Sequence, residues 1–240
     1  MGADPRPVYL LAGGRPSRSR KGPDPLAGEA LMLAGISHPS VAYIGAASGD
    51  NAGFRAMLTR LLQKAGAGEV KLAPLCGGAD PRGAMRVIES SHLVFISGGD
   101  VEAGMNVLVE TGMVDFLRAQ YRDGKPFFGV SAGSIMLAKS WVRWKDPDDH
   151  SSAEAFPCLA IARVCCDTHD EEGGWEELRA LARLIPARTV AYGIPSGTAL
   201  IAAPDGSVRA LGGEVQCFRR TGAVVRKIQS IRDSRFRVRD

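Results

Sequence analysis

The sequence has no apolar run long enough to cross a membrane, and its first residues lack the features of an export signal. A bilayer-spanning helix needs about 20 consecutive apolar residues, and no stretch of the 240 residues approaches that length. Met1 to Pro7 contains no apolar stretch preceded by positive charge, so we expect no signal peptide. We therefore expect a cytoplasmic protein without a membrane partner.

The five cysteines lack the paired spacing of a zinc site or a redox motif. Their odd number, without a signal peptide, predicts reduced thiols. Asp146, Asp148, Asp149 and His150 could collect a divalent cation, but ligand spacing favours a solvated acidic loop. Gly13-Gly14 lacks the Gly-Lys-Ser ending of a phosphate-binding loop, which argues against a nucleotide. We expect neither a metal nor another cofactor.

The net charge of +4 is concentrated at the C-terminal end of the chain. Residues 219–240 contain eight Lys or Arg and two Asp, a net charge of +6, which leaves about −2 for the remainder. A nearly neutral body excludes a basic face spread over the fold, so no nucleic-acid partner is expected. In the basic tail from about residue 229, the alternation from Arg235 to Arg239 favours a solvated strand edge, with polyanion binding as the alternative.

Short apolar runs alternate with helix-compatible segments up to residue 139. Apolar residues make up 45% and charged residues 23% of the chain, which is ordinary for a globular domain. The alternation predicts an α/β fold of three layers, a mostly parallel central sheet with helices on both faces. Strands are predicted at 8–12, 41–46, 70–75, 93–97 and 126–130, and helices at 26–34, 54–65, 81–90, 102–121 and 135–139.

The pattern becomes β-rich after a polar segment at 141–155. Asp205-Gly206 is typical of a hairpin turn. No linker, low-complexity tract or internal repeat interrupts the chain, so residues 1–240 are predicted to form a single domain with a β-rich C-terminal part. A strand is predicted at 159–166, a helix at 175–184, and further strands at 189–194, 199–203, 207–211, 214–219 and 223–228.

A tight turn, Gly129-Val130-Ser131-Ala132-Gly133, is the strongest chemical signal in the chain. An apolar run leads into it and a helix-compatible segment follows. This strand, turn and helix arrangement exposes a nucleophilic serine at the edge of a sheet. The two glycines leave no Cβ where the turn packs tightly. A purely structural strand-to-helix turn is the alternative.

A serine hydroxyl needs a base to take its proton. Of the four histidines, His169 stands directly after an apolar strand, where catalytic loops of such sheets lie, and a structural histidine is the alternative. Asp167 lies two residues earlier and on an extended chain would point the same way, so it could orient the ring. Ala132 and Gly99 are the candidate N–H donors of an oxyanion hole.

Gly98, Gly99 and Asp100 follow the strand predicted at 93–97. The missing side chain at Gly99 would let a substrate carbonyl approach, and Gly98 and Asp100 are candidate substrate contacts. In the alternative interpretation, Asp100 only caps the next helix. The loop that begins at Arg15 carries four basic residues and could present Arg15 to an acidic substrate, or could be a surface loop.

Four motifs, in this order and spacing, resemble the dipeptidase E and cyanophycinase family of serine peptidases. They are Ser-Gly-Gly-Asp at 97–100, Gly-Val-Ser-Ala-Gly-Ser at 129–134, Asp-Thr-His at 167–169 and Gly-Ile-Pro-Ser-Gly-Thr-Ala at 193–199.

The resemblance implies a class I glutamine-amidotransferase-like fold, with Ser131 as nucleophile, His169 as base, and Gly99 and Ala132 as oxyanion donors. It also implies that the substrate is a small peptide or isopeptide, cleaved at aspartyl or β-aspartyl residues. The assembly state is left open, a homodimer included.

The chain departs from the family pattern in two places, the residues after the two glycines, Asp100-Val101-Glu102, and the fourth motif. The family usually has the glutamate of its triad in the fourth motif, where this chain has Ser196. Asp167 or one of residues 170–172 substitutes for it, or Ser196 orients His169 as a neutral partner, or the protein is a weak or inactive relative that acts as a binding or regulatory module. Losing the charged partner of the base can cost orders of magnitude in rate.

Overall fold

The structure is a computed structural model that describes residues 4–13, 22–146 and 148–233. Arg15 and the basic residues that follow it lie outside these ranges, as does the alternation from Arg235 to Arg239. The predictions made for both segments therefore stay predictions.

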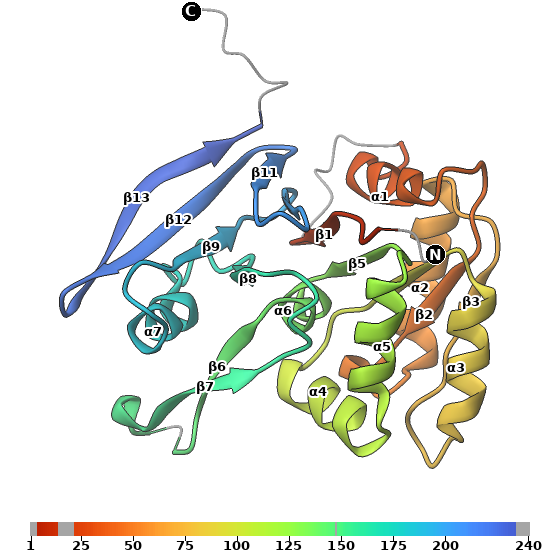
Figure 1. The fold of residues 1–240 in the computed structure, drawn as a ribbon, viewed down its shortest axis with the longest axis horizontal. Coiled ribbons are helices and arrows are strands. Elements are labelled where there is room, and N and C mark those ends of the chain that lie inside the picture. The colour runs from red at the N-terminus through yellow and green to blue at the C-terminus, as the bar shows by residue number, and fades with distance from the viewer. Residues whose placement is uncertain (1–3, 14–21, 147, 234–240) are drawn as a thin grey trace, which may run out of the picture.

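A seven-stranded sheet runs through the middle of the molecule (Figure 1). Its strands are β1 (Val8–Leu11), β2 (Val41–Ile44), β3 (Val70–Leu72), β4 (Leu93–Ile96), β5 (Phe127–Val130), β10 (Ala199–Ala202) and β11 (Val208–Leu211). Their order is β11-β10-β1-β5-β4-β2-β3. The neighbouring strands β1, β5, β4, β2 and β3 are all parallel, whereas β10 and β11 are added antiparallel at one edge.

Helices cover both faces of this sheet. Alternate residues of each strand point to opposite faces, so Leu10 and Ile96 pack under one layer of helices and Leu11 and Phe95 under the other. The first layer consists of α3 (Pro81–Ser90), α4 (Val101–Glu110), α5 (Met113–Arg122) and α6 (Ala132–Leu137). The second consists of α1 (Pro25–Leu31) and α2 (Ala52–Lys64).

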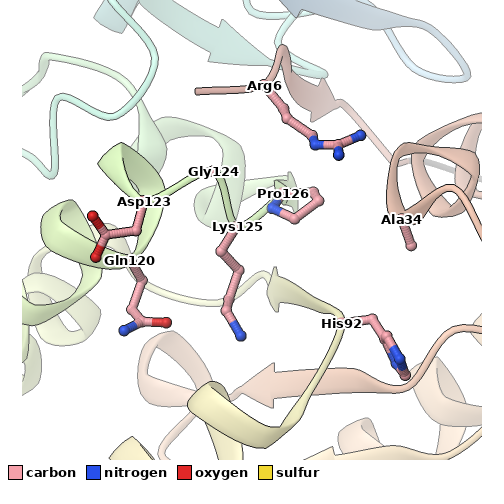
Figure 2. Close-up of a pocket in the computed structure, with 8 residues that line it drawn as sticks. All are labelled: Arg6, Ala34, His92, Gln120, Asp123, Gly124, Lys125 and Pro126. Carbon is pink, nitrogen blue, oxygen red and sulfur yellow. The ribbon is translucent and has the colours of Figure 1, made fainter. Parts of the chain in front are cut away.

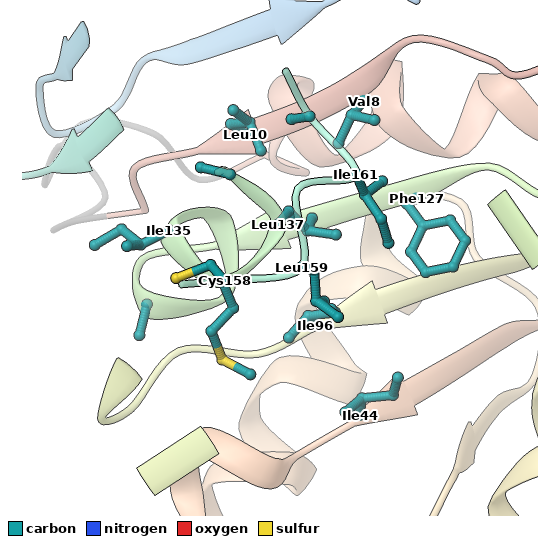
Figure 3. Close-up of a cluster of buried hydrophobic side chains, with 14 of the residues drawn as sticks. Val8, Leu10, Ile44, Ile96, Phe127, Ile135, Leu137, Cys158, Leu159 and Ile161 are labelled. Carbon is teal, nitrogen blue, oxygen red and sulfur yellow. The ribbon is translucent and has the colours of Figure 1, made fainter. Parts of the chain in front are cut away.

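Figure 3 shows the larger core, in which side chains from β1, β2, β4 and β5 meet those of α6. A strand that is buried on both faces reads as a continuous apolar run, and this is how the central strands appear in the sequence. The predicted fold class, an α/β protein with a mostly parallel central sheet between two helical layers, is confirmed.

A second sheet forms the β-rich C-terminal part. It is ordered β13-β12-β9-β8, with only β8 and β9 parallel, and it packs on α7 (Glu176–Leu184) (Figure 1). On β8, Cys165 contributes to the α7 core and Cys166 to the core of the central sheet. The strands are β8 (Cys165–Thr168), β9 (Val190–Ile194), β12 (Glu214–Thr221) and β13 (Val224–Arg232).

The polar segment predicted at 141–155 is a hairpin of β6 (Ser140–Trp144) and β7 (Ala153–Pro157), so the sequence interpretation missed two strands. Arg143 and Glu154 are directly opposite, and Arg143 Nε donates to Glu154 Oε1 at 2.6 Å. Arg143 Nη1 also donates to Glu102 of α4 at 2.8 Å. The charged residues that pair across the hairpin made the segment polar in sequence, so it was interpreted as a loop. Three short 3₁₀ turns complete the described elements: η1 (Met32–Ala34), η2 (Ala46–Ser48) and η3 (His150–Ser152).

Two further predictions were wrong in detail. The helix predicted at 102–121 is broken in two by Gly112, whose φ of 68° belongs to the left-handed region that glycine tolerates. The strand predicted at 159–166 begins only at Cys165. Residues 159–162 instead bond to the C-terminal carbonyls of α6, with Leu159 N–H donating to Met136 O at 2.9 Å and Ala162 N–H to Leu137 O at 2.8 Å. This segment satisfies helix-end carbonyls that would otherwise lack donors.

The hairpin turn predicted at Asp205-Gly206 is confirmed, because it joins the antiparallel strands β10 and β11. All five cysteines are free. Within the described ranges, no helix combines the length and the apolar character that a bilayer crossing requires. The single-domain assignment stays a prediction.

Candidate active site

The carboxyl ends of β1, β4 and β5 meet at Ser131, the residue that follows β5. Ser131 has φ 55° and ψ −127°, a conformation that L-residues rarely adopt. Its N–H donates to Leu11 O at 2.9 Å, and its own carbonyl accepts from Ser134 N–H at 2.8 Å. The buried Ser134 hydroxyl donates to the same Leu11 carbonyl at 2.8 Å. The strained turn is thus fastened to the end of β1 by two bonds.

The turn also depends on backbone contacts that leave no room for a side chain. A Cβ at Gly129 would stand 2.6 Å from the carbonyl carbon of Gly133, and one at Gly133 would collide with the carbonyl oxygen of Ile96. A Cβ at Gly98 would lie 3.1 Å from Ser131 Cβ, so the end of β4 runs directly beside the serine. The tight packing expected at Gly129 and Gly133 is therefore present in the structure.

His169 reaches Ser131 from the other sheet. Its Nε2 lies 2.7 Å from Ser131 Oγ, within hydrogen-bond distance. The chain turns sharply at His169, whose φ is 45°, directly after β8. The His169 N–H donates to Ile194 O at 2.9 Å, which fixes the residue to the end of β9. The structure therefore brings together the two residues that the sequence analysis paired.

The two backbone amides predicted to face an oxyanion are those of Gly99 and Ala132. In the described ranges, neither N–H has a hydrogen-bond partner. Gly99 has φ 142°, and a Cβ there would collide with the carbonyl of Ala47, so only glycine fits. Asp100 caps α4, because its Oδ1 accepts from Ala103 N–H at 2.8 Å, so the capping role named in the alternative interpretation is present. A substrate contact of Asp100 or Gly98 stays a prediction.

Asp167 is placed differently from the extended-chain expectation. Its Oδ1 accepts from Thr168 N–H at 2.7 Å, while its buried Oδ2 has no partner in the part of the chain that the structure describes. Burial raises the pKa of Asp167 to about 7, opposed by the Thr168 bond. Because the chain turns at His169, residues 167 and 169 do not share one face of a straight strand. The geometry does not support Asp167 as the group that orients the imidazole.

Ser196 contacts an acid. Its N–H donates to Glu171 Oε1 at 3.1 Å, which ties the loop after β9 to the loop after β8. Burial raises the pKa of Glu171, but bonds from the hydroxyl and N–H of Ser196, together with the nearby His169, hold the pKa below its usual range. Residues 170–172 were candidates for the orienting acid only as a group. The Glu171–Ser196 contact depends on how β8 and β9 align, and no local signal reveals it.

Other acidic side chains gather near the same loops. Glu177 Oε2 accepts from the indole N–H of Trp141 at 2.7 Å, and burial raises the pKa of Glu177, with Asp170 and Asp100 among the charges that add to the shift. Asp170 Oδ2 accepts from Glu176 N–H at 3.0 Å at the start of α7. In the described ranges, no group of three His, Cys, Asp or Glu residues is arranged to hold a metal ion.

A pocket of about 330 Å³ lies at the opposite edge of the central sheet. Its residues precede β4 and β5, whereas Gly98 and Ser131 follow those strands. Lys125 Nζ there donates to Ile88 O and Ser91 O, each at 2.7 Å, and Arg6 Nη1 donates to Leu33 O at 2.9 Å. Lys125 and one donor of Arg6 are thus bonded within the protein, and the pocket is separate from the site at Ser131. Figure 2 shows its lining residues: Arg6, Ala34, His92, Gln120, Asp123, Gly124, Lys125 and Pro126.

Comparison with known families gives one match across most of the chain. The model of Peptidase family S51 matches residues 10–209. This range includes the turn at Ser131, His169, the Gly98-Gly99 segment and Ser196.

Individual relatives are more distant. Peptidase E of Haemophilus influenzae is 25% identical over 121 residues, and peptidase E of Actinobacillus pleuropneumoniae serotype 5b is 26% identical over 122 residues. These alignments cover 48% of this chain and 56% and 52% of the relatives, so the chain spans about half the length of the curated relatives it matches. Among solved structures, a peptidase from an acI-B1 Actinobacterium superposes with a TM-score of 0.71 at 18% identity, covering 97% of this chain and 98% of that one. At this identity the likeness shows a shared fold.

The packing at the serine turn generates a first prediction. We expect Gly133→Ala to destabilise the protein by about 1–3 kcal/mol, because the added methyl group meets the Ile96 carbonyl and backbone must move. A displaced turn should also slow any reaction of the Ser131 hydroxyl by roughly 100-fold. Urea unfolding and the labelling rate of Ser131 measure the two effects. Gly83→Ala is the matched control, since its Cβ meets nothing closer than 3.9 Å within α3, and we expect it to stabilise by about 0.5–1 kcal/mol.

The buried carboxyl of Asp167 generates a second prediction. Its folded pKa of about 7 lies above the unfolded value, so its contribution to stability is fully present below about pH 4 and is lost as pH rises through 7. Asp167→Asn removes this loss, and we expect the variant to exceed wild type at pH 8 by up to about 4 kcal/mol, with little difference at pH 4. Free energies of unfolding at both pH values check this. The exposed Asp115→Asn should show no such pH-dependent gain, and an equal gain there would contradict the assignment.

Proposed function

The chain belongs to Peptidase family S51, and we propose that it is a serine peptidase that hydrolyses small peptides or isopeptides through an acyl-enzyme on Ser131. The observation that carries this proposal is the 2.7 Å separation between Ser131 Oγ and His169 Nε2. A serine becomes a useful nucleophile when a base lies within hydrogen-bond reach to take its proton. Here the two groups come from residues 38 apart in the chain, on different sheets.

The proposed reaction follows the positions of these groups. Ser131 Oγ attacks the carbonyl carbon of the scissile bond while His169 Nε2 accepts the hydroxyl proton. The carbonyl oxygen becomes an oxyanion, and the N–H groups of Gly99 and Ala132 are the donors that stabilise it. The carbon–nitrogen bond then breaks, and His169 passes the proton to the leaving amine. Water, deprotonated by the same imidazole, releases the acyl group and restores the Ser131 hydroxyl.

Specificity for aspartyl or β-aspartyl residues is the finer part of the proposal, and the family supports it. Three acidic groups lie near one another beside the loop after β8, because Asp170 and Asp100 both act on Glu177. They suit the free ammonium of a short peptide rather than an acidic side chain. A basic partner for an aspartyl group would therefore come from the loop that begins at Arg15.

A non-catalytic binding module is the alternative function, and one observation favours it. Ser196 replaces the glutamate that the family usually has in the fourth motif. A module of this kind would not need a reactive serine, so its hydroxyl would behave like that of any surface serine. Reactivity of Ser131 separates the two functions.

A third prediction concerns labelling by a serine-directed fluorophosphonate. We expect wild type to be labelled roughly 100-fold faster or more than Ser131→Ala, because the variant lacks the hydroxyl that lies 2.7 Å from His169 Nε2. Mass spectrometry of the intact protein and of its peptides gives the rate and the site. Ser90→Ala, an exposed serine of α3, should be labelled like wild type. Equal labelling of wild type and Ser131→Ala would favour the binding module.

A fourth prediction concerns the substrate panel. Aspartyl, β-aspartyl and neutral dipeptides are compared by kcat/KM. We expect the aspartyl or β-aspartyl substrates to exceed the neutral ones by at least tenfold, and the preference to fall when Arg15 is changed to Ala. Equal rates on all three classes would remove both the aspartyl preference and the proposed part of Arg15.

A further inference from the structure

The proposed peptidase needs a group that holds His169 in position. In a serine, histidine and acid arrangement, the acid lies at the imidazole nitrogen that does not face the serine, fixes the ring orientation and stabilises the imidazolium. Nε2 of His169 faces Ser131 Oγ, so Nδ1 is the nitrogen left for an acid. The fourth motif supplies no carboxylate, because residue 196 is serine. An orienting carboxylate would have to come from elsewhere in the chain.

The alignment of β8 and β9 brings one carboxylate to this place. The strands are parallel, with Thr168 opposite Ile194, so the residues that follow them leave side by side. Past the turn at His169, Glu171 reaches across to Ser196, whose N–H donates to Glu171 Oε1 at 3.1 Å. The carboxyl group of Glu171 thus lies at residue 196, the position from which the family usually presents its glutamate. A carboxylate arrives at the same loop from a different residue.

The neighbouring acids are committed elsewhere. Asp167 is buried, and burial raises its pKa to about 7, which makes it a weak partner for an imidazolium at neutral pH. Asp170 caps the start of α7 through the N–H of Glu176. Glu177 accepts the indole N–H of Trp141. Of the four acids, Glu171 is the one that the described ranges show bonded to the fourth motif.

The environment of Glu171 also suits a charged partner. Burial raises its pKa, but the hydroxyl and N–H of Ser196 favour the ionised form, and the charge of His169 acts in the same direction. In the described ranges, Nδ1 of His169 has no hydrogen-bond partner, so the ring is free to receive the carboxylate. Catalytic hydrogen bonds are often long in a free enzyme and shorten when substrate binds.

We propose that Glu171 is the positioning acid of His169, and that Ser196, which occupies the place of the family's glutamate, anchors it. The inference rests on the proposed function, since it assigns the third group of the same site. In this interpretation residue 196 supplies no carboxylate of its own, and its backbone N–H instead holds the carboxylate of Glu171.

Kinetics of Glu171 variants on the best dipeptide of the panel test this fifth prediction. We expect Glu171→Gln to lower kcat by roughly 100- to 10,000-fold with KM within threefold, because the neutral amide no longer stabilises the imidazolium. Glu171→Asp should retain more activity than Glu171→Gln. Glu172→Gln, the next residue along the same exposed loop, is the matched control and should keep wild-type kcat.

A double variant gives a readout that loss of structure cannot mimic. Ser196→Glu returns the carboxylate to the position the family usually uses, so we expect it to raise kcat of Glu171→Ala at least tenfold in the combined variant. Melting temperatures of all variants show whether each protein is folded. Absence of any rescue, together with full activity of Glu171→Gln, would overturn the proposal.

Fluorophosphonate labelling separates this inference from the proposed function. If wild type shows no labelling that depends on Ser131, the peptidase proposal itself fails. If wild type is labelled at Ser131 and Glu171→Gln is labelled equally fast, the peptidase proposal stands and the assignment of Glu171 is wrong. Slow but Ser131-dependent labelling of Glu171→Gln supports both.

Discussion

The site depends on how closely three strands approach one another at the turn after β5. Ser131 can hold its hydroxyl out of the sheet only because its backbone adopts a rare conformation, and Gly129 and Gly133 allow neighbouring backbone to come within contact distance. The bonds from Ser131 and Ser134 to Leu11 O retain that conformation. The strain of such a residue persists only where the surrounding structure overdetermines it. The same packing places Gly98 beside the serine, so one constraint positions both the hydroxyl and the segment that carries a candidate oxyanion donor.

Local patterns were enough to predict the parallel strands of the central sheet, the turn at Ser131 and the pairing of this serine with His169. Each of these has its signal within a few adjacent residues: an apolar run, two glycines, or a histidine directly after a strand. The hairpin of β6 and β7 was missed because Arg143 and Glu154 neutralise each other only once the strands are paired. Gly112 was visible in the sequence, but helical spacing on both sides concealed the break.

The orienting acid could not be chosen from the sequence for a related reason. Several carboxylates follow His169 within three residues, and their roles differ only through contacts with distant segments. Glu171 meets Ser196 because β8 and β9 are in parallel register, and Asp167 loses its expected direction because the chain turns at His169. The register of β8 against β9 and the left-handed backbone of His169 arise only in the folded chain. Neither can be deduced from the spacing of residues in the sequence.

Strand β8 is shared by two cores, with Cys165 in one and Cys166 in the other. Ser131 follows β5 of the central sheet, whereas His169 follows β8 of the second sheet. The distance between the two side chains therefore depends on how the two sheets are placed relative to each other. Sliding of the smaller sheet would pull the pair apart, and it would also disturb the core of the central sheet, in which Cys166 of β8 is packed. Conversely, a molecule that binds Ser131 and His169 at once would stabilise the arrangement of the sheets in which the two residues are in contact, because a ligand favours the state that it binds.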